Sequence, residues 1–232
     1  MLFQRKNSLV QDSTNYISDN LILLENVSVD YGNLQALDSV QVVVKKGEIL
    51  FVTGPSGAGK TTLLKVMSGE QKPTKGSLSL PLKTVFTSQV FQDLRLNSKK
   101  SCEANLWASY DRSIHGSKSE FQRELSELCR YLGIFDRLGL KVRDANGGLK
   151  QKVALIRALL SRPDLILADE PTASLDKHNA MRVFETLEFY NKNRGLTVVW
   201  ASHNKELVKQ FSGKIVHLDK GRIIYSGHVC FI

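Results

Sequence analysis

The chain has 232 residues, of which 42% are hydrophobic and 24% charged, an ordinary composition that excludes fibrous and intrinsically disordered proteins. Its apolar runs have only the length of a strand, so we expect no membrane-spanning helix. The formal net charge of +9 fits a nucleic acid, an anionic lipid or a nucleotide as partner, because each is an anion.

Residues 1–20 are predicted to be a polar N-terminal extension, ahead of a single domain at 21–232. The extension lacks the apolar stretch of a secretory signal, so we expect a cytosolic protein. The three cysteines, Cys102, Cys129 and Cys230, are far apart in the sequence. This spacing favours reduced thiols over a disulfide or a zinc site.

The first part of the chain is predicted to be rich in strands. β-Branched residues and turn signals indicate strands at residues 21–30, 40–44 and 48–53. A helical pattern follows at 59–67, and a turn leads to two further strands, at 77–80 and 83–91.

The second part alternates helices with strands after a helical insertion. Apolar residues between 101 and 140 recur at helical spacing, which predicts a helical inset at about 93–147. The elements expected after it are helices at 148–160, 177–193 and 205–211, and strands at 165–169, 197–201, 214–219 and 222–225. This order predicts an α/β fold.

A phosphate-binding loop is predicted between a strand and a helix, because residues 54–61 match the pattern G-x-x-x-x-G-K-[ST]. Backbone N–H groups of such a loop and the start of the next helix bind phosphate. Lys60 is expected to reach the β- and γ-phosphates, and the Thr61 hydroxyl to bind Mg²⁺. The nucleotide-binding residues expected here are Gly54, Pro55, Ser56, Gly57, Ala58, Gly59, Lys60, Thr61 and Thr62. The loop alone does not separate ATPases from GTPases or kinases.

Two adjacent carboxylates end a later apolar strand. Asp169 and Glu170 follow the run Leu-Ile-Leu-Ala, at the edge where ligands of open α/β sheets bind. Asp169 is expected to face the Mg²⁺ ion, and Glu170 to orient or deprotonate a water that attacks the γ-phosphate. An isolated pair would more often be a solvated turn, but the phosphate loop favours the catalytic interpretation.

With these motifs in this order, the sequence resembles the ABC-transporter ATPase family from about residue 21 to 225. Residues 54–61 resemble its Walker A loop, 165–169 its Walker B strand, Glu170 its catalytic glutamate and 173–176 its D-loop. The resemblance implies a P-loop NTPase fold, with a RecA-like core, an antiparallel β subdomain and a helical inset. It also implies ATP and Mg²⁺ as cofactors.

The resemblance assigns further site residues. His203 is similar to the switch histidine that contacts the γ-phosphate, and Tyr31 to the aromatic residue that stacks on adenine. Gln92 resembles the Q-loop glutamine, a Mg²⁺ ligand that links the core to the inset, and Gln89 is its rival. Asp176 corresponds to the D-loop aspartate, although it could also cap the following helix.

The signature motif departs from the family pattern Leu-Ser-Gly-Gly-Gln. Here it reads Ala145-Asn146-Gly147-Gly148-Leu149, so only the glycines match. In the family this segment closes over the γ-phosphate of the opposite subunit. Asn146 can cap a helix and donate hydrogen bonds, but Leu149 offers no polar group. We expect weakened recognition across the interface, and the alternative is a simple turn that starts a helix.

The resemblance implies that two cassettes, in the simplest case identical, bind ATP head to tail and drive separate membrane permease subunits from the cytoplasmic face. Residues 90–96 and 169–176 are similar to the branch of lipoprotein-release, macrolide-export and cell-division cassettes. No nucleic acid is expected, since nucleic-acid-linked ABC ATPases usually carry two cassettes or a coiled-coil insertion. The other alternative is a regulatory cassette that hydrolyses ATP weakly. The cargo and the direction of transport stay open.

Overall fold

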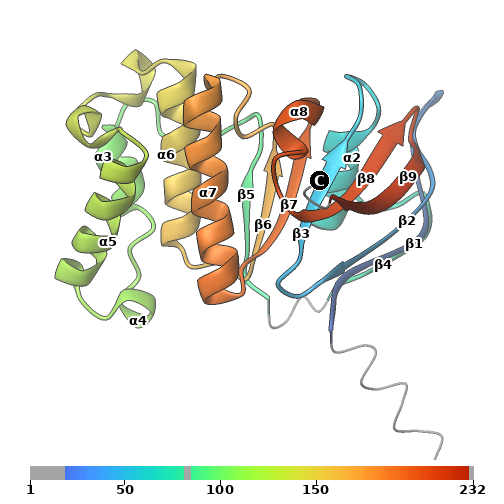
Figure 1. Ribbon diagram of the computed structural model, residues 1–232, viewed down its shortest axis with the longest axis horizontal. Helices are drawn as coiled ribbons and strands as arrows, with labels where there is room; N and C mark the ends of the chain where they lie inside the picture. Colours follow the sequence, from blue (N-terminus) through green and yellow to red (C-terminus); the bar gives the residue numbers. More distant parts are fainter. Residues whose placement is uncertain (1–18, 81–84, 230–232) are drawn as a thin grey trace, which may run out of the picture.

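A computed structural model describes residues 19–80 and 85–229 of the chain (Figure 1). Most of the polar extension expected at residues 1–20 lies outside these ranges, and Asn20 already begins the first strand. Within the described ranges, every helix is too short or too polar to cross a membrane.

The described strands form two sheets. The smaller is antiparallel with the order β2-β1-β4, and the larger has the order β5-β6-β7-β3-β8-β9. In the larger sheet neighbouring strands run parallel, except that β9 is antiparallel to β8. The strands are β1 (Asn20–Tyr31), β2 (Leu34–Lys45), β3 (Ile49–Thr53), β4 (Lys75–Ser79), β5 (Thr87–Val90), β6 (Leu165–Asp169), β7 (Thr197–Ser202), β8 (Gly213–Asp219) and β9 (Arg222–Val229). The α/β fold predicted from the sequence is confirmed.

The helices divide into a core set and an inset. The core set contains α2 (Lys60–Met67), α6 (Gly147–Leu160), α7 (Lys177–Arg194) and α8 (Lys205–Val208). The inset contains α3 (Cys102–Trp107), α4 (Arg112–His115) and α5 (Lys118–Tyr131). In Figure 1 the inset lies on one side of α6 and α7, and the antiparallel sheet lies at the opposite end of the molecule.

The central strands are apolar because both faces of the larger sheet are covered. Every residue of β3 is buried, and successive side chains point to opposite faces. Phe51 stacks on Phe184 of α7, with ring centroids 5.6 Å apart. On the opposite face of β3, Leu50 and Val52 pack into a second hydrophobic cluster, which also contains the buried face of β1. This rigid, fully packed sheet fixes the positions of the loops at its carboxyl edge.

The inset is held by local signals as well as by packing. In α5, Phe121, Leu125 and Leu128 form the buried face that the helical spacing predicts. Ser117 and Glu120 form a capping box at its start, which satisfies two backbone N–H groups reciprocally.

Several element boundaries differ from the prediction. β2 begins six residues earlier than expected, because it pairs with β1 as far as Tyr31 opposite Leu34. β4 begins inside the expected turn, where Ser28 pairs with Lys75. β5 starts only at Thr87, and residues 81–84 are outside the described ranges. α8 stops early, because the N–H groups of Gln210 and Phe211 bond to carbonyls three positions back.

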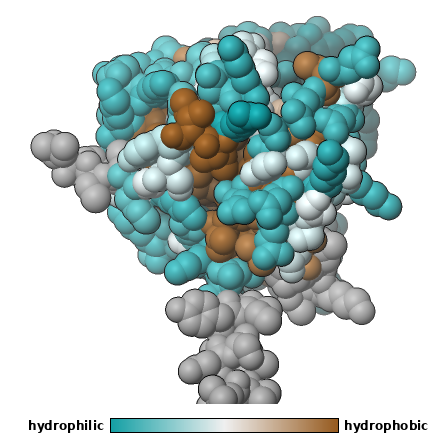
Figure 2. Space-filling model, turned by 90° about the vertical axis from the view of Figure 1, so that its right-hand side faces the viewer, coloured by the Kyte–Doolittle hydropathy of each residue, from teal (hydrophilic) through white to brown (hydrophobic). Residues whose placement is uncertain are grey.

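Figure 2 views the molecule from the side of β1, β2 and β9. Hydrophobic side chains gather near the centre of this face, within a largely hydrophilic surface. A groove of about 420 Å³ between the two sheets is lined partly by apolar side chains, among them Leu23, Val42 and Val216.

Candidate nucleotide-binding site

A pocket of about 890 Å³ lies at the carboxyl edge of the larger sheet. It collects side chains from loops that are far apart in the sequence, as expected for an open α/β sheet. The sequence-predicted site residues that line it are Tyr31, Ser56, Gly57, Gly59, Lys60, Thr61, Thr62, Gln92, Gly147, Asp169, Glu170 and His203.

The phosphate loop joins β3 to α2 by a tight turn. Gly59, at the start of α2, has φ +103, and a Cβ atom there would lie 2.5 Å from the carbonyl oxygen of Ala36. Glycine is therefore required by both conformation and space. The Lys60 Nζ donates hydrogen bonds to the carbonyl oxygens of Gly54 at 2.9 Å and Pro55 at 3.0 Å. The lysine thus folds back across its own loop.

The pair Thr61 and Asp169 has the chemistry of a divalent cation site. The Thr61 hydroxyl donates to Asp169 Oδ2 at 2.6 Å. The other carboxylate oxygen, Oδ1, is buried and has no hydrogen-bond partner in the described part of the chain. Burial raises the pKa of Asp169. An orphaned carboxylate oxygen beside a hydroxyl fits Mg²⁺, a cation that binds oxygen ligands and favours the ionised carboxylate.

Glu170 is held by two basic residues. Its Oε2 lies 2.8 Å from His203 Nδ1, and its Oε1 accepts the His203 backbone N–H at 2.9 Å. Lys60 Nζ lies 3.8 Å from Oε1. The Glu170 backbone has φ +53, a strained conformation for a residue that is not glycine. Such a fixed carboxylate can orient or deprotonate a water molecule.

Gln151 is a site residue that the sequence analysis missed. Its Nε2 donates to the backbone oxygen of Glu170 at 3.3 Å, and its Oε1 accepts the Ser174 N–H at 3.0 Å. The side chain thus ties the first turns of α6 to both sides of the loop that carries Glu170. Its position three residues after Gly148 is the sequence signal that could have found it. Lys150 also lines the pocket.

Tyr31 lies at one end of the pocket. Its hydroxyl donates to Gln71 Oε1 at 3.1 Å, and the residue is 45% exposed. The bond fixes the outer end of the ring and leaves the ring partly accessible, as stacking on a base requires.

The two candidate Q-loop glutamines lie in different surroundings. Gln92 lines the nucleotide pocket just after β5. Gln89 lies within β5 and lines a different pocket, beside Arg157. These positions support Gln92 as the Q-loop glutamine.

The signature-like segment lies largely apart from the phosphate loop of its own chain. Asn146 and Gly148 line a second pocket of about 320 Å³ with Asp176, whereas Gly147 lines the nucleotide pocket. Asn146 Oδ1 accepts the N–H of Leu149 at 2.9 Å and caps α6. Leu149 is only 4% exposed and packs into the core.

Asp176 acts as a helix cap in this structure. Its Oδ1 accepts the Asn179 N–H at 2.8 Å at the start of α7. This backbone hydrogen bond, with a second from the Asn179 amide, lowers the pKa of Asp176.

A family model described as ABC transporter matches residues 37–173. The cell division ATP-binding protein FtsE of Bacillus subtilis (strain 168) is 33% identical over 224 residues, which cover 88% of this chain and 95% of FtsE. The chain belongs to the ABC transporter family. ATP is therefore the nucleotide of this ABC cassette, and the resemblance stated from the sequence is confirmed.

Two further comparisons describe this ABC cassette. The methionine import ATP-binding protein MetN of Corynebacterium diphtheriae is 33% identical over 85% of the chain, and the chain spans 62% of its length. A solved dimeric post-hydrolysis state of the ATP-binding cassette MJ0796, bound to ADP and Pi, superposes with a TM-score of 0.78 at 26% identity. This match covers 90% of the chain and 99% of MJ0796. A P-loop cassette fold is thereby confirmed.

Proposed function

We propose that this cassette hydrolyses ATP and thereby energises a membrane transport complex. The observation that carries the proposal is the arrangement of the Glu170 carboxylate. It contacts His203 and lies 3.8 Å from Lys60 Nζ, next in sequence to the carboxylate of Asp169, which accepts the Thr61 hydroxyl. This is the set of groups that phosphoryl transfer to water needs.

Each residue has a role in this proposal. The loop N–H groups and Lys60 bind the β- and γ-phosphates, and Lys60 uses its third N–H for this while its two carbonyl partners remain. Thr61, Asp169 and Gln92 would hold Mg²⁺, which would supply charge stabilisation to the phosphates. Glu170 orients and deprotonates the attacking water, while His203 holds the carboxylate and contacts the γ-phosphate.

A second cassette completes the site in this proposal. Asn146, Gly148 and Asp176 line a pocket apart from the chain's own phosphate loop, so they are available to a nucleotide bound by another copy. We infer a head-to-tail homodimer in which these residues and Gly147 cover the partner's ATP. The dimeric MJ0796 cassette supports this arrangement.

The transport role requires membrane-spanning permease subunits. Relatives are named as ATP-binding proteins of methionine import, phosphonates import and cell division. We infer that this cassette binds permease subunits from the cytoplasmic face. FtsE and MetN are equally similar to the chain, at 33% identity. We therefore base the assignment of this chain to the branch that includes cell-division cassettes on residues 90–96 and 169–176.

Phosphate release from ATP tests the catalytic assignment. Glu170→Gln keeps the shape of the side chain but removes its basicity, so the rate should fall at least about 100-fold. Glu188→Gln, which removes a half-buried carboxylate on α7 that pairs with Lys192, is the matched control and should leave the rate unchanged. A Glu170→Gln protein as active as wild type would refute the assigned chemistry.

A weakly hydrolysing regulatory cassette is the second candidate, favoured by the buried, apolar Leu149. Turnover measured with the co-purified membrane partner separates the two. A motor should be stimulated by its partner, whereas a regulatory cassette should bind ATP and stay slow.

A further inference from the structure

The segment that follows Gln92 contains a strained residue. Arg95 has φ +48, an unfavourable conformation for a residue that is not glycine, and Leu94 beside it lines the nucleotide pocket together with Gln92. Its N–H donates to Asp93 Oδ1 at 3.2 Å, a bond within the same segment. Backbone strain persists only where the surrounding structure holds it, and it is common at functional sites. The contacts that hold Arg95 therefore bear on the position of Gln92.

Arg157 of α6 supplies two of these contacts. Its Nη1 donates to the carbonyl oxygen of Arg95 at 2.7 Å, and its Nη2 donates to the carbonyl oxygen of Leu94 at 2.8 Å. Hydrogen bonds from a charged donor are stronger than neutral ones. Because the guanidinium is planar, two bonds to consecutive carbonyl groups also fix the direction of the backbone.

The remaining contacts restrain the segment less. Arg95 Nη2 lies 2.9 Å from Glu70 Oε1, but the Arg95 side chain is more than half exposed, so solvent weakens this ion pair. Leu94 and Leu96 pack against the core, and such apolar contacts are not directional. The two bonds from Arg157 are therefore the main restraint on the direction of this backbone.

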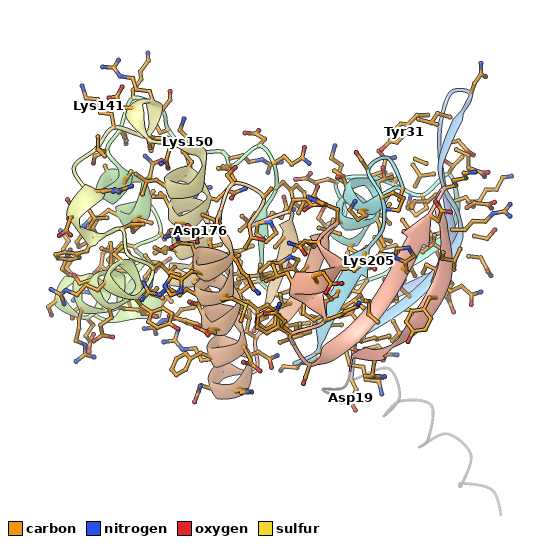
Figure 3. The ribbon with its side chains drawn as sticks, turned by 45° about the horizontal axis from the view of Figure 1, so that its top comes forward. Asp19, Tyr31, Lys141, Lys150, Asp176 and Lys205 are labelled. Carbon is orange, nitrogen blue, oxygen red and sulfur yellow. The ribbon has the colours of Figure 1, made fainter. Side chains whose placement is uncertain are left out.

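The same helix also positions the loop of Glu170. Gln151 bonds that loop, and Arg157 bonds the segment after Gln92. Figure 3 shows Lys150, which lines the nucleotide pocket, at the start of this helix. Gln151 and Arg157 lie less than two helical turns apart. One stretch of α6 thus sets the positions of two loops of the nucleotide site.

We propose that Arg157 is a positioning residue for ATP hydrolysis. It holds the backbone after Gln92, so that the Gln92 side chain stays at the nucleotide. Arg157 lines a different pocket, beside Gln89, and acts on the nucleotide through Gln92. The inference rests on the role of Gln92 in the proposed function, but not on the chemistry of Glu170.

Amide hydrogen exchange of the nucleotide-free full chain tests the restraint itself. Arg157→Met keeps most of the alkyl stem and removes both bonds. Exchange in a peptide that covers residues 91–96 should become about 10- to 100-fold faster, the change expected from the loss of a charge-assisted hydrogen bond. Wild-type exchange in this peptide would overturn the proposal.

Arg162→Met is the matched control. The Arg162 Nη1 also donates to a backbone carbonyl oxygen, that of Ile114 at 2.8 Å, but this bond lies in the inset. The control should keep wild-type exchange at residues 91–96 and wild-type ATP hydrolysis. Equal acceleration of exchange in Arg157→Met and Arg162→Met would show a general loss of stability and overturn the proposal.

Steady-state ATP hydrolysis tests the connection to Gln92. Gln92→Ala and Arg157→Met should each lower kcat roughly 10- to 100-fold. The double variant should be no slower than Gln92→Ala, because a residue that acts through Gln92 has no further effect once that side chain is removed. A double variant whose loss is the product of the two single losses would overturn the proposal, as would a wild-type kcat in Arg157→Met.

If Arg157→Met does not fold, Arg157→Lys replaces it in both measurements, since lysine keeps the charge and the stem without the planar fork. Smaller changes in the same directions are then expected, and no change in either measurement would overturn the proposal. Failure of the proposed catalytic role of Glu170 would leave the exchange result unaffected, so the two proposals fail separately.

Discussion

His203 holds both carboxylate oxygens of Glu170. Its backbone N–H donates to Oε1 at 2.9 Å, and its Nδ1 lies 2.8 Å from Oε2. The first contact survives removal of the side chain and the second does not, so the two can be separated by mutation.

His203→Ala should therefore slow ATP hydrolysis by roughly 10- to 1,000-fold, because the carboxylate loses one of its two supports and the γ-phosphate loses a donor. Steady-state phosphate release measures this. His228→Ala, an exposed histidine on β9, should behave like wild type. Equal rates for wild type and His203→Ala would exclude a role for the imidazole.

Asp169→Asn should abolish Mg²⁺-dependent hydrolysis yet stabilise the nucleotide-free protein by about 1 kcal/mol, since it removes a buried charge whose Oδ1 has no partner. Thermal unfolding with EDTA measures the stability. An Asn variant less stable than wild type would contradict this.

The stability difference between wild type and Asp169→Asn should depend on pH, because the pKa of Asp169 is raised. The folded state holds the proton more tightly than the unfolded state, so wild type loses stability as the pH rises from the unfolded pKa through the folded one. The advantage of Asp169→Asn should thus grow with pH over this window and vanish below it. Unfolding curves of both proteins at several mildly acidic pH values measure this difference in stability.

Gln151→Met should lower kcat roughly 10- to 100-fold and change the KM for ATP little, because both bonds of the Gln151 side chain go to the loop that carries Glu170. A rise in KM with unchanged kcat would contradict a positioning role. Gln122→Met, on α5, is the control for removing an amide.

Tyr31→Ala should raise the KM for ATP roughly 5- to 100-fold through loss of stacking on the base. Tyr31→Phe keeps the ring and loses only the bond to Gln71, so it should change the KM by less than about twofold. Similar KM values in all three proteins would exclude stacking.

Leu149→Gln restores the residue usual in the family, but it should destabilise the fold by about 1 to 3 kcal/mol, because the amide would be buried among apolar side chains. Leu149→Met, of similar volume, should cost less than about 1.5 kcal/mol. Denaturant unfolding of the two variants would test this order of stability.

The sequence predicted the α/β fold and the phosphate loop because their signals are local. Residues 54–61 carry the loop's glycines, lysine and threonine within one turn, and β6 is apolar up to Asp169. Strand and helix ends were predicted less well, since the start of β2 depends on its pairing with β1. Such backbone pairing depends on both strands, so a sequence window that covers one strand does not show where the pairing ends.

Contacts between distant side chains were beyond sequence reasoning. The bonds of Gln151 to Glu170 and Ser174 join two segments of the chain, and the burial of Leu149 reflects packing around α6. The choice between Gln92 and Gln89 as the Q-loop glutamine depends on where β5 ends, and the sequence does not fix that end.

The folded-back position of Lys60 has a consequence for turnover. The ammonium group has two oxygen partners within its own loop, the carbonyl oxygens of Gly54 and Pro55. An ammonium group has three N–H donors, so Lys60 can donate to a phosphate oxygen while both of these bonds remain. When the products depart, the two carbonyl groups still hold the lysine, so the emptied loop leaves no isolated charge and the cassette can reset.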